Sequence, residues 1–268
     1  MTRPRQLIVK TLLGTIVPLL LSLSAGLCWQ ESFSTAFARG WASPAPQNWE
    51  PTIRRFEEGD RTNPPKPGVI VFTGSSTIVR WTTLVHDMQP LEVINRGFGG
   101  SEFSDLNQYT KRIVVAYHPK AVVVYEGDND LASGSPKTPE TVANDLRQFV
   151  EIVHSELPET WIYVISIKPS RLRWNEWPTM QKADRMMQAF SRTQDRVQFI
   201  DVASAMFDAK GNLPVDLFVA DGLHLTPKAY ALWTSLIKPI LLERFSSKTK
   251  VSQSARSKLN LGWDASWH

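Results

Sequence analysis

Short apolar runs alternate with amphipathic segments along most of the chain. Runs of this length are typical of strands buried on both faces, and they occupy residues 69–72, 91–95, 121–125, 161–167 and 197–202. Helical periodicity fills the segments 105–117, 139–157, 179–192 and 227–245. Because parallel strands need long crossover connections, strands that alternate with helices predict an α/β fold with one five-stranded parallel sheet covered on both faces.

This pattern predicts a single domain at residues 68–246, and it shows no internal repeat. A lead-in at residues 39–67 is rich in proline and polar residues. Within it Trp49, Ile53 and Phe56 recur at the spacing of one helical face, which predicts a short amphipathic helix at the edge of the domain.

The two ends of the chain have the composition of segments outside the fold. Residues 1–38 begin with basic residues, continue through an uncharged run at 11–30 and reach Ala36-Phe37-Ala38, a small-x-small site for a signal peptidase. We therefore expect an exported protein, with a retained membrane anchor as the alternative, since such a run is long enough to span a bilayer. A lipoprotein signal at Cys28 is disfavoured because a bulky leucine precedes it. The tail, 247–268, is polar and typical of disorder.

The composition narrows the classes of function. The chain has 268 residues, 42% of them hydrophobic and 21% charged, as in a soluble globular protein with a sizeable core. The net charge is +4, but the basic residues are scattered, so we expect no nucleic-acid partner. A single cysteine rules out an intramolecular disulfide and a cysteine-based metal cluster. Ten tryptophans are many for this length, and several lie in predicted loops, where exposed aromatic side chains often bind ligands.

The first candidate for chemistry follows the first strand. Gly74 allows a sharp turn and leaves Ser76 at the carboxyl end of that strand, where open α/β sheets bind ligands. Ser76 is a candidate nucleophile, although a helix N-cap is the alternative. The second strand ends in a glycine-rich loop in which Gly100 could offer a backbone donor, unless the loop is only flexible. The third strand ends near Asn129, whose amide could donate to a developing oxyanion.

Two further motifs are candidates either for catalysis or for metal binding. Asp221 and His224 stand three residues apart before the last helix, where a carboxylate can orient an imidazole as a base. A zinc site would need further ligands, and the other histidines show no pairing at ligand spacing. A calcium loop at Asp128 and Asp130 fails, because Ala132 and the residue after it stand where that loop needs a ligand and a glycine. We expect no metal and no cofactor.

In this order, the motifs resemble those of the SGNH, or GDSL-type, hydrolases, above all bacterial relatives of the catalytic subunits of platelet-activating factor acetylhydrolase. Gly74-Ser75-Ser76 matches the first block, Gly100 the second, Asn129 the third and Asp221-Gly222-Leu223-His224 the last. The resemblance covers roughly residues 68–240. One departure is Ser75, where the name-giving motif has Asp. No Gly-x-Ser-x-Gly elbow surrounds the nucleophile, which argues against an α/β-hydrolase.

The resemblance implies a three-layer, flavodoxin-like sandwich and an exported serine esterase for small acyl esters, in particular acetyl esters. Ser76 would be the nucleophile, His224 the base and Asp221 its orienting partner. The backbone N–H groups of Ser76 and Gly100, with the Asn129 amide, would hold the oxyanion.

The alcohol part of the substrate is left open by the sequence. The loop after the fourth strand carries Arg171, Arg173 and Trp174, and guanidinium groups beside indoles suit a sugar or an anionic head group. A lid that packs its tryptophans on the rim is the alternative. Two other functions also stay open: an acyltransferase that acts on cell-envelope sugars, and a non-catalytic envelope-binding module. The oligomeric state is left open as well.

Overall fold

The structure is a computed structural model, and it describes residues 48–246. The predicted targeting segment, residues 39–47 of the proline-rich lead-in and the predicted polar tail lie outside the described residues. Within the described part, no helix is both long enough and apolar enough to cross a membrane.

Five parallel strands form one sheet in the order β2-β1-β3-β4-β5. They are β1 (Ile70–Gly74), β2 (Val93–Gly97), β3 (Ala121–Tyr125), β4 (Trp161–Ile165) and β5 (Val197–Ile200). The helices are α2 (Glu50–Thr62), α3 (Ser76–Val79), α4 (Leu84–Asp87), α5 (Phe103–Ile113), α6 (Pro139–Glu156), α7 (Trp177–Ser191) and α8 (Pro227–Phe245). This strand order is that of the flavodoxin-like folds, so the predicted α/β class and parallel sheet are confirmed.

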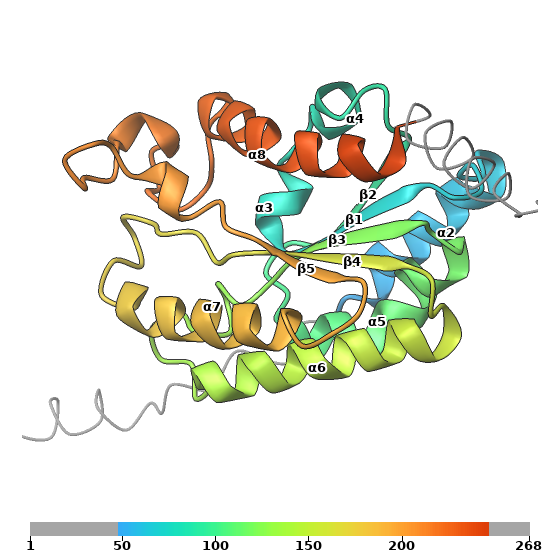
Figure 1. Ribbon diagram of the computed structural model, residues 1–268, viewed down its shortest axis with the longest axis horizontal. Helices are drawn as coiled ribbons and strands as arrows, with labels where there is room; N and C mark the ends of the chain where they lie inside the picture. Colours follow the sequence, from blue (N-terminus) through green and yellow to red (C-terminus); the bar gives the residue numbers. More distant parts are fainter. Residues whose placement is uncertain (1–47, 247–268) are drawn as a thin grey trace, which may run out of the picture. The chain divides into compact units, whose positions relative to one another are not determined.

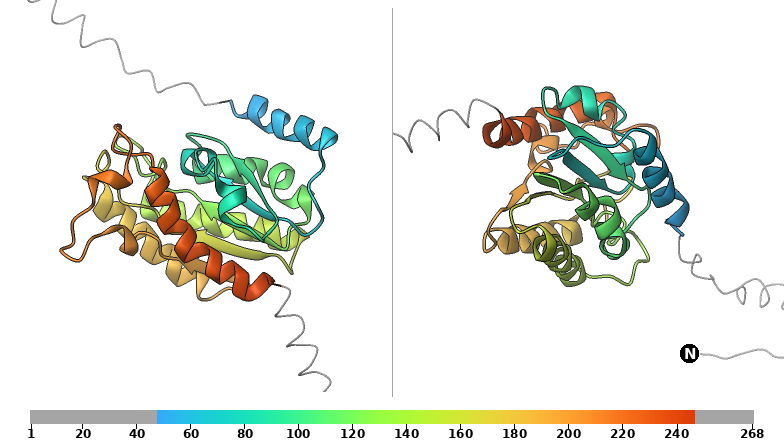
Figure 2. Two further views of the ribbon diagram at one scale, coloured as in Figure 1. Left: turned by 90° about the horizontal axis from the view of Figure 1, so that it is seen from above. Right: turned by 90° about the vertical axis from the view of Figure 1, so that its right-hand side faces the viewer.

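Helices cover both faces of the sheet. Figure 1 shows α5, α6 and α7 on one face and α3, α4 and α8 on the other, and the right-hand view of Figure 2 shows helices above and below the sheet from the side. Each face of the sheet has its own hydrophobic core, and alternate residues of one strand point into opposite cores. Val71 packs in one core, while Ile70 and Phe72 pack in the other. Strands buried in this way read as continuous apolar runs, which is why the pattern located them.

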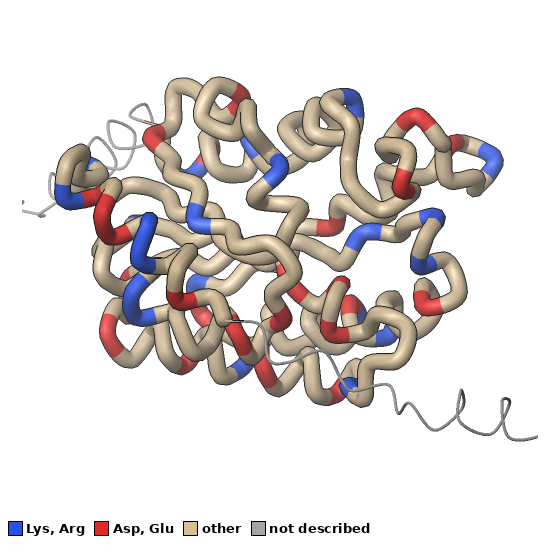
Figure 3. The backbone as a smooth tube through the Cα atoms, turned by 180° about the vertical axis from the view of Figure 1, so that it is seen from behind, with Lys and Arg blue, Asp and Glu red and all other residues tan. Residues whose placement is uncertain are grey.

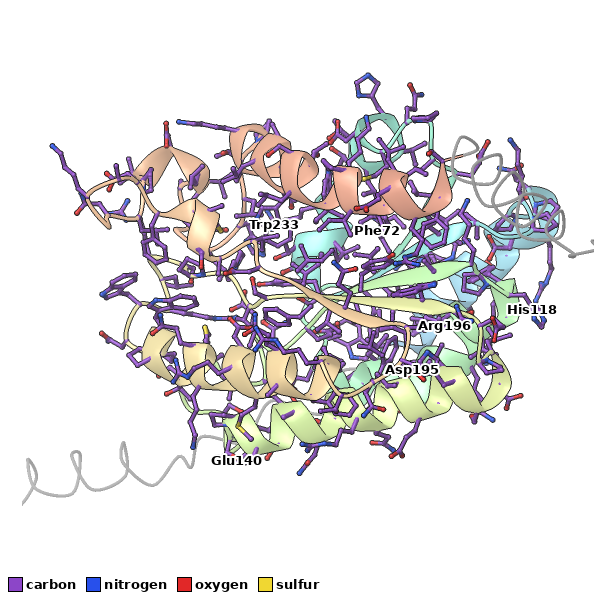
Figure 4. All side chains as sticks on the ribbon, viewed as in Figure 1. Phe72, His118, Glu140, Asp195, Arg196 and Trp233 are labelled. Atoms are coloured by element: carbon purple, nitrogen blue, oxygen red, sulfur yellow. The ribbon has the colours of Figure 1, made fainter. Side chains whose placement is uncertain are left out.

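Aromatic side chains fill the space between α8 and the sheet. Phe72 of β1 and Trp233 of α8 point into this layer (Figure 4), and both contact Trp81 edge to face. The Tyr230 ring stacks on Trp81, and its hydroxyl donates to the carbonyl of Thr77 at 2.8 Å. This bond ties α8 to the short helix that begins at Ser76.

Several boundaries differ from the predicted ones. β2 runs two residues later than expected, because its polar Asn95 and Arg96 lie half-buried on an edge strand. The long helix expected after it ends at Ile113, and a 3-10 turn, Val115–Tyr117, follows. The predicted amphipathic helix is α2, with Ile53 buried. Two 3-10 turns, Ser204–Met206 and Val215–Leu217, follow β5; the prediction had no elements there.

The register brings three strand ends to one level. Gly74, the last residue of β1, pairs with Gly97 of β2 and with Tyr125 of β3. The loops that follow these strands therefore begin side by side at one edge of the sheet. Acidic and basic residues are interspersed over the described backbone (Figure 3), so charge alone does not mark a site.

Candidate active site

The turn after β1 requires a glycine. Gly74 has a φ of 131°, and a Cβ at this position would lie 2.0 Å from the carbonyl oxygen of Tyr125. The missing side chain lets the chain bend sharply away from the sheet. Ser75 N–H donates to the same carbonyl at 3.2 Å, and Ser76 becomes the first residue of α3. The N–H of a first helical residue has no acceptor within its helix, so it is available to a ligand.

Three side chains from distant parts of the chain form a hydrogen-bonded series. Nε2 of His224 lies 3.0 Å from Oγ of Ser76, although 148 positions separate the two residues. Nδ1 of His224 lies 2.6 Å from Oδ2 of Asp221. The other carboxylate oxygen of Asp221 accepts the backbone N–H groups of Leu223 and His224, at 2.8 and 2.9 Å. The structure thus brings together the three residues that the sequence assigned to one site.

These partners determine where the imidazole proton resides. Burial acts to raise the pKa of Asp221, but hydrogen bonds from the ring and backbone of His224 outweigh it and hold that pKa below its usual range. The ionised carboxylate can only accept, so Nδ1 of the imidazole carries the proton. In the neutral ring Nε2 is then an acceptor, and the Ser76 hydroxyl donates to it. This is the tautomer that a base for Ser76 needs.

The loop that carries Asp221 and His224 is held from two sides. Val219 N–H donates to the His224 carbonyl at 2.9 Å, which closes a narrow turn around Gly222. The Gly222 carbonyl in turn accepts the N–H groups of Arg171 and Leu172, at 2.9 and 3.1 Å. The loop after β4 therefore lies directly against the loop of the base.

The glycine-rich loop after β2 lies against Ser76. A Cβ placed on Gly99 would lie 3.6 Å from the Cβ of Ser76. Gly100 has a φ of 86°, a conformation that glycine adopts without strain. Among the described residues its N–H has no hydrogen-bond acceptor. This N–H and that of Ser76 are thus both available at the same edge of the sheet.

Asn129 reaches the same loop from the end of β3. Its Nδ2 donates to the carbonyl of Ser101 at 2.9 Å, next to Gly100. Its Oδ1 accepts NH2 of Arg173 at 2.9 Å. Two amide contacts to the protein leave one N–H of Nδ2 for a further acceptor.

Arg173, a predicted substrate ligand, bonds to protein groups around Asn129. Besides its bond to Asn129, its NH1 donates to the carbonyl of Asp128 at 2.7 Å and to the carboxylate of the same residue. Only 15% of the Arg173 side chain is exposed. Both N–H groups of NH1 and one N–H of NH2 therefore already have acceptors within the protein.

The acids of the alternative calcium loop have basic partners. Asp128 accepts Nζ of the fully buried Lys168 at 2.6 Å, in addition to Arg173. Burial acts to raise the pKa of Asp128, but the two cations outweigh it and lower the pKa to about 2. Asp130 pairs with Lys137 at 2.9 Å. No cluster of His, Cys, Asp and Glu suited to a metal occurs in the described part of the chain.

A buried acid also supports the glycine-rich loop. Burial, together with the nearby Asp130, raises the pKa of Glu126 well above its usual range. Oε1 of Glu126 lies 2.6 Å from Oγ of Ser101, which donates to the Phe98 carbonyl at 2.8 Å. A serine hydroxyl has one proton, so it donates to one of these two oxygens at a time. Either contact holds Ser101, and with it the loop beside Gly100, in place.

Arg171 and Trp174 line an open cavity next to this site. The cavity has a volume of about 450 Å³, and Gly211, Asn212 and Leu213 form its other wall. Trp174 is 49% exposed, and one edge of its indole approaches Phe207. The lid alternative is therefore only partly met, since the indole packs on a neighbour and is still half exposed.

Sequence reasoning missed the buried polar groups Glu126 and Lys168 beneath the site, and it considered Asp128 only as a ligand of a calcium loop. A signal for them existed, because charged residues directly follow two otherwise apolar strands. Only tertiary contacts decide whether such residues face solvent or the interior.

A family model of the GDSL-like Lipase/Acylhydrolase family matches residues 59–232. The chain belongs to this family, and it is accordingly a carboxylic ester hydrolase. The predicted resemblance to the SGNH hydrolases is thereby confirmed. A search of the curated proteins found none that matches this chain.

Solved structures with the same fold share little sequence with this chain. One, described as a platelet activating factor of Streptococcus pneumonia, has a TM-score of 0.64 at 20% identity and covers 82% of this chain and 100% of its own. An acylhydrolase of Bacteroides fragilis has a TM-score of 0.63 at 19% identity, over 74% and 99%. A variant of an acetyl-xylooligosaccharide esterase from Geobacillus Stearmophilus has a TM-score of 0.53 at 16% identity, over 67% and 94%.

Proposed function

We propose that this protein is an exported serine esterase that removes small acyl groups, in particular acetyl groups, from hydroxyl groups of a carbohydrate. The observation that carries the proposal is the hydrogen-bonded series from Asp221 through His224 to Ser76, at 2.6 and 3.0 Å. Nucleophile, base and orienting group are the parts that covalent acyl transfer requires.

The acylation step follows from this tautomer. Oγ of Ser76 attacks the ester carbonyl carbon while its proton passes to Nε2 of His224. The carbonyl oxygen becomes an oxyanion, which accepts the N–H groups of Ser76 and Gly100 and the free N–H of Asn129. Asp221 stabilises the imidazolium. When the tetrahedral intermediate collapses, the bond to the alcohol breaks, and His224 returns the proton to the alcohol oxygen.

Deacylation reverses these roles with water as the nucleophile. His224 takes a proton from water, the hydroxide attacks the acyl-enzyme, and the same donors hold the second oxyanion. Collapse releases the acid and returns the proton to Oγ of Ser76. A sugar hydroxyl in place of water would make the protein an acyltransferase, with the same residues in the same roles.

The cavity beside the catalytic loop supports a carbohydrate as the alcohol part. The half-exposed indole of Trp174 is a flat apolar group on which a sugar ring can pack, and Arg171 on the same cavity offers donors for hydroxyl oxygens. Two similar structures are an acetyl esterase with an acetate ion and an esterase of acetylated xylooligosaccharides. These names support the acetyl group as the part to be removed.

The test compares an acetylated xylooligosaccharide with 4-nitrophenyl acetate as substrates of the same preparation. We expect Trp174→Ala and Arg171→Ala to raise KM for the sugar ester about two- to tenfold, as for loss of a stacking contact. KM for the aryl ester should stay unchanged, because it lacks the sugar. Arg192→Ala, an exposed change at the far end of α7, is the control.

Two results would contradict parts of this proposal. An unchanged KM for the sugar ester in both variants would remove the carbohydrate subsite. Acetyl groups recovered on an added sugar acceptor, without a matching release of acetate, would make transfer the reaction instead of hydrolysis.

Export rests on the amino-terminal sequence alone, with its basic start, uncharged run and Ala36-Phe37-Ala38 site. We expect the protein isolated from its native host to begin at Arg39, as read by amino-terminal sequencing. Intact Met1 in the membrane fraction would favour the retained anchor, and intact protein in the cytosol would refute both forms of the proposal.

A further inference from the structure

We infer that Arg173 is a positioning residue for the oxyanion donor Asn129, and that it forms part of a buried cluster with Asp128 and Lys168. This inference rests on the proposed function, and it deepens that function by assigning a role to charges the mechanism has not used. It also replaces the expectation that Arg173 binds the substrate directly.

The first argument concerns the orientation of the Asn129 amide. A guanidinium has only donors, so the group that faces Arg173 at 2.9 Å must be the acceptor Oδ1. A carbonyl oxygen only accepts, so the group that faces Ser101 O at 2.9 Å must be Nδ2. Both contacts select the same one of two amide orientations that differ by a 180° flip. The flipped amide would aim its oxygen at the oxyanion, and Arg173 excludes it.

The second argument concerns charge. A cation bonded to Oδ1 draws electron density from the amide and makes the N–H of Asn129 a stronger donor. In the cluster, Lys168 and Arg173 share one carboxylate, that of Asp128. Two cations thus face one carboxylate within this cluster, and the guanidinium is the cation in contact with Asn129. In surroundings with few waters, such a charge stabilises an anionic transition state more than a neutral ester.

The third argument concerns rigidity. Asp128 is 4% exposed and Lys168 is fully buried, and the Tyr125 hydroxyl also donates to the Asp128 carboxylate, at 3.0 Å. NH1 of Arg173 holds the Asp128 carbonyl, the peptide group directly before Asn129. The guanidinium therefore clamps both the backbone and the side chain of one turn. Positions fixed in this way cost little reorganisation when the transition state forms.

The test is a double-mutant cycle of Arg173→Met and Asn129→Ala, assayed on 4-nitrophenyl acetate. Arg173→Met alone should lower kcat about 10- to 100-fold with little change in KM. Losses of this size are typical when a residue that only orients a functional side chain is replaced, as for the residues that orient metal ligands. With Asn129 already replaced by Ala, the same change should have almost no further effect, because the donor it orients is gone.

Arg173→Lys keeps the charge beside Asp128 but cannot hold two acceptors in one plane. It should melt close to the wild-type temperature and still show lowered kcat, and it takes the place of Arg173→Met in the cycle if that variant does not fold. Arg192→Met serves as the control for removal of an arginine from the surface.

Each outcome decides between two roles for Arg173. Effects that multiply in the double variant would overturn the inference, because Arg173 would then act independently of Asn129. A raised KM with unchanged kcat would also overturn it and return Arg173 to substrate binding. If the wild-type protein shows no ester hydrolysis that Ser76→Ala abolishes, the proposed function is refuted instead, together with the roles that rest on it.

Discussion

Replacing Ser76 by alanine should lower kcat for an acetyl ester at least ~10⁴-fold, since one lost member of a cooperating triad removes most of its contribution. The fold should persist, because Ser76 Oγ has only His224 as its partner in the described structure. A fluorophosphonate probe should form one adduct on the wild-type protein, and peptide mapping should place it on Ser76.

The neighbouring serine supplies a matched control. Ser75 is buried, and its N–H, not its hydroxyl, bonds to the Tyr125 carbonyl. Ser75→Ala should therefore still react with the probe and turn over substrate. Ser76 would be refuted as the nucleophile if the adduct maps to Ser75 or if the Ser76→Ala variant retains activity.

The sequence predicted those parts of the fold in which one local pattern determines the structure. Ala121–Tyr125 is apolar without interruption because both faces of β3 are covered, and it was located to the residue. The predicted bounds of the edge strand β2 were two residues too early because Asn95 and Arg96 are polar. Asn95 Nδ2 donates to the Ile78 carbonyl at 2.6 Å, and the Arg96 guanidinium lies 4.8 Å from the centre of the Tyr117 ring. Such contacts between distant elements leave no periodic signal.

The residues of the site also fall into those that a local pattern predicts and those that only the structure identifies. Ser76 and His224 could be proposed from the sequence because each follows a recognisable turn, and parallel strands bring their carboxyl ends to one edge. Arg171 and Arg173 look alike in the sequence, and only the structure separates them. One lines an open cavity, and the other faces a buried carboxylate. That difference depends on Lys168 and Asp128, which lie 40 positions apart.

The Asn129 amide should contribute to the rate and not to substrate binding. Its bond to the carbonyl oxygen strengthens as that oxygen becomes charged, so it lowers the barrier more than it stabilises bound ester. Asn129→Ala should reduce kcat about 10²–10³-fold with little change in KM, as expected for one lost oxyanion donor. Steady-state kinetics and thermal melting on the same preparation measure both effects.

Asn129→Asp separates this role from a structural one. Aspartate has the same shape, serves equally well in a turn, and its carboxylate would form an ion pair with Arg173. Its other oxygen would face the Ser101 carbonyl, which accepts from Nδ2 in the wild type, so the variant should melt earlier than the wild type but remain folded. It should nevertheless be at least as slow as Asn129→Ala, because a carboxylate offers no N–H and repels the developing oxyanion. If Asn129 only shapes the turn, the aspartate variant will turn over substrate at the wild-type rate, and the amide has no part in the mechanism.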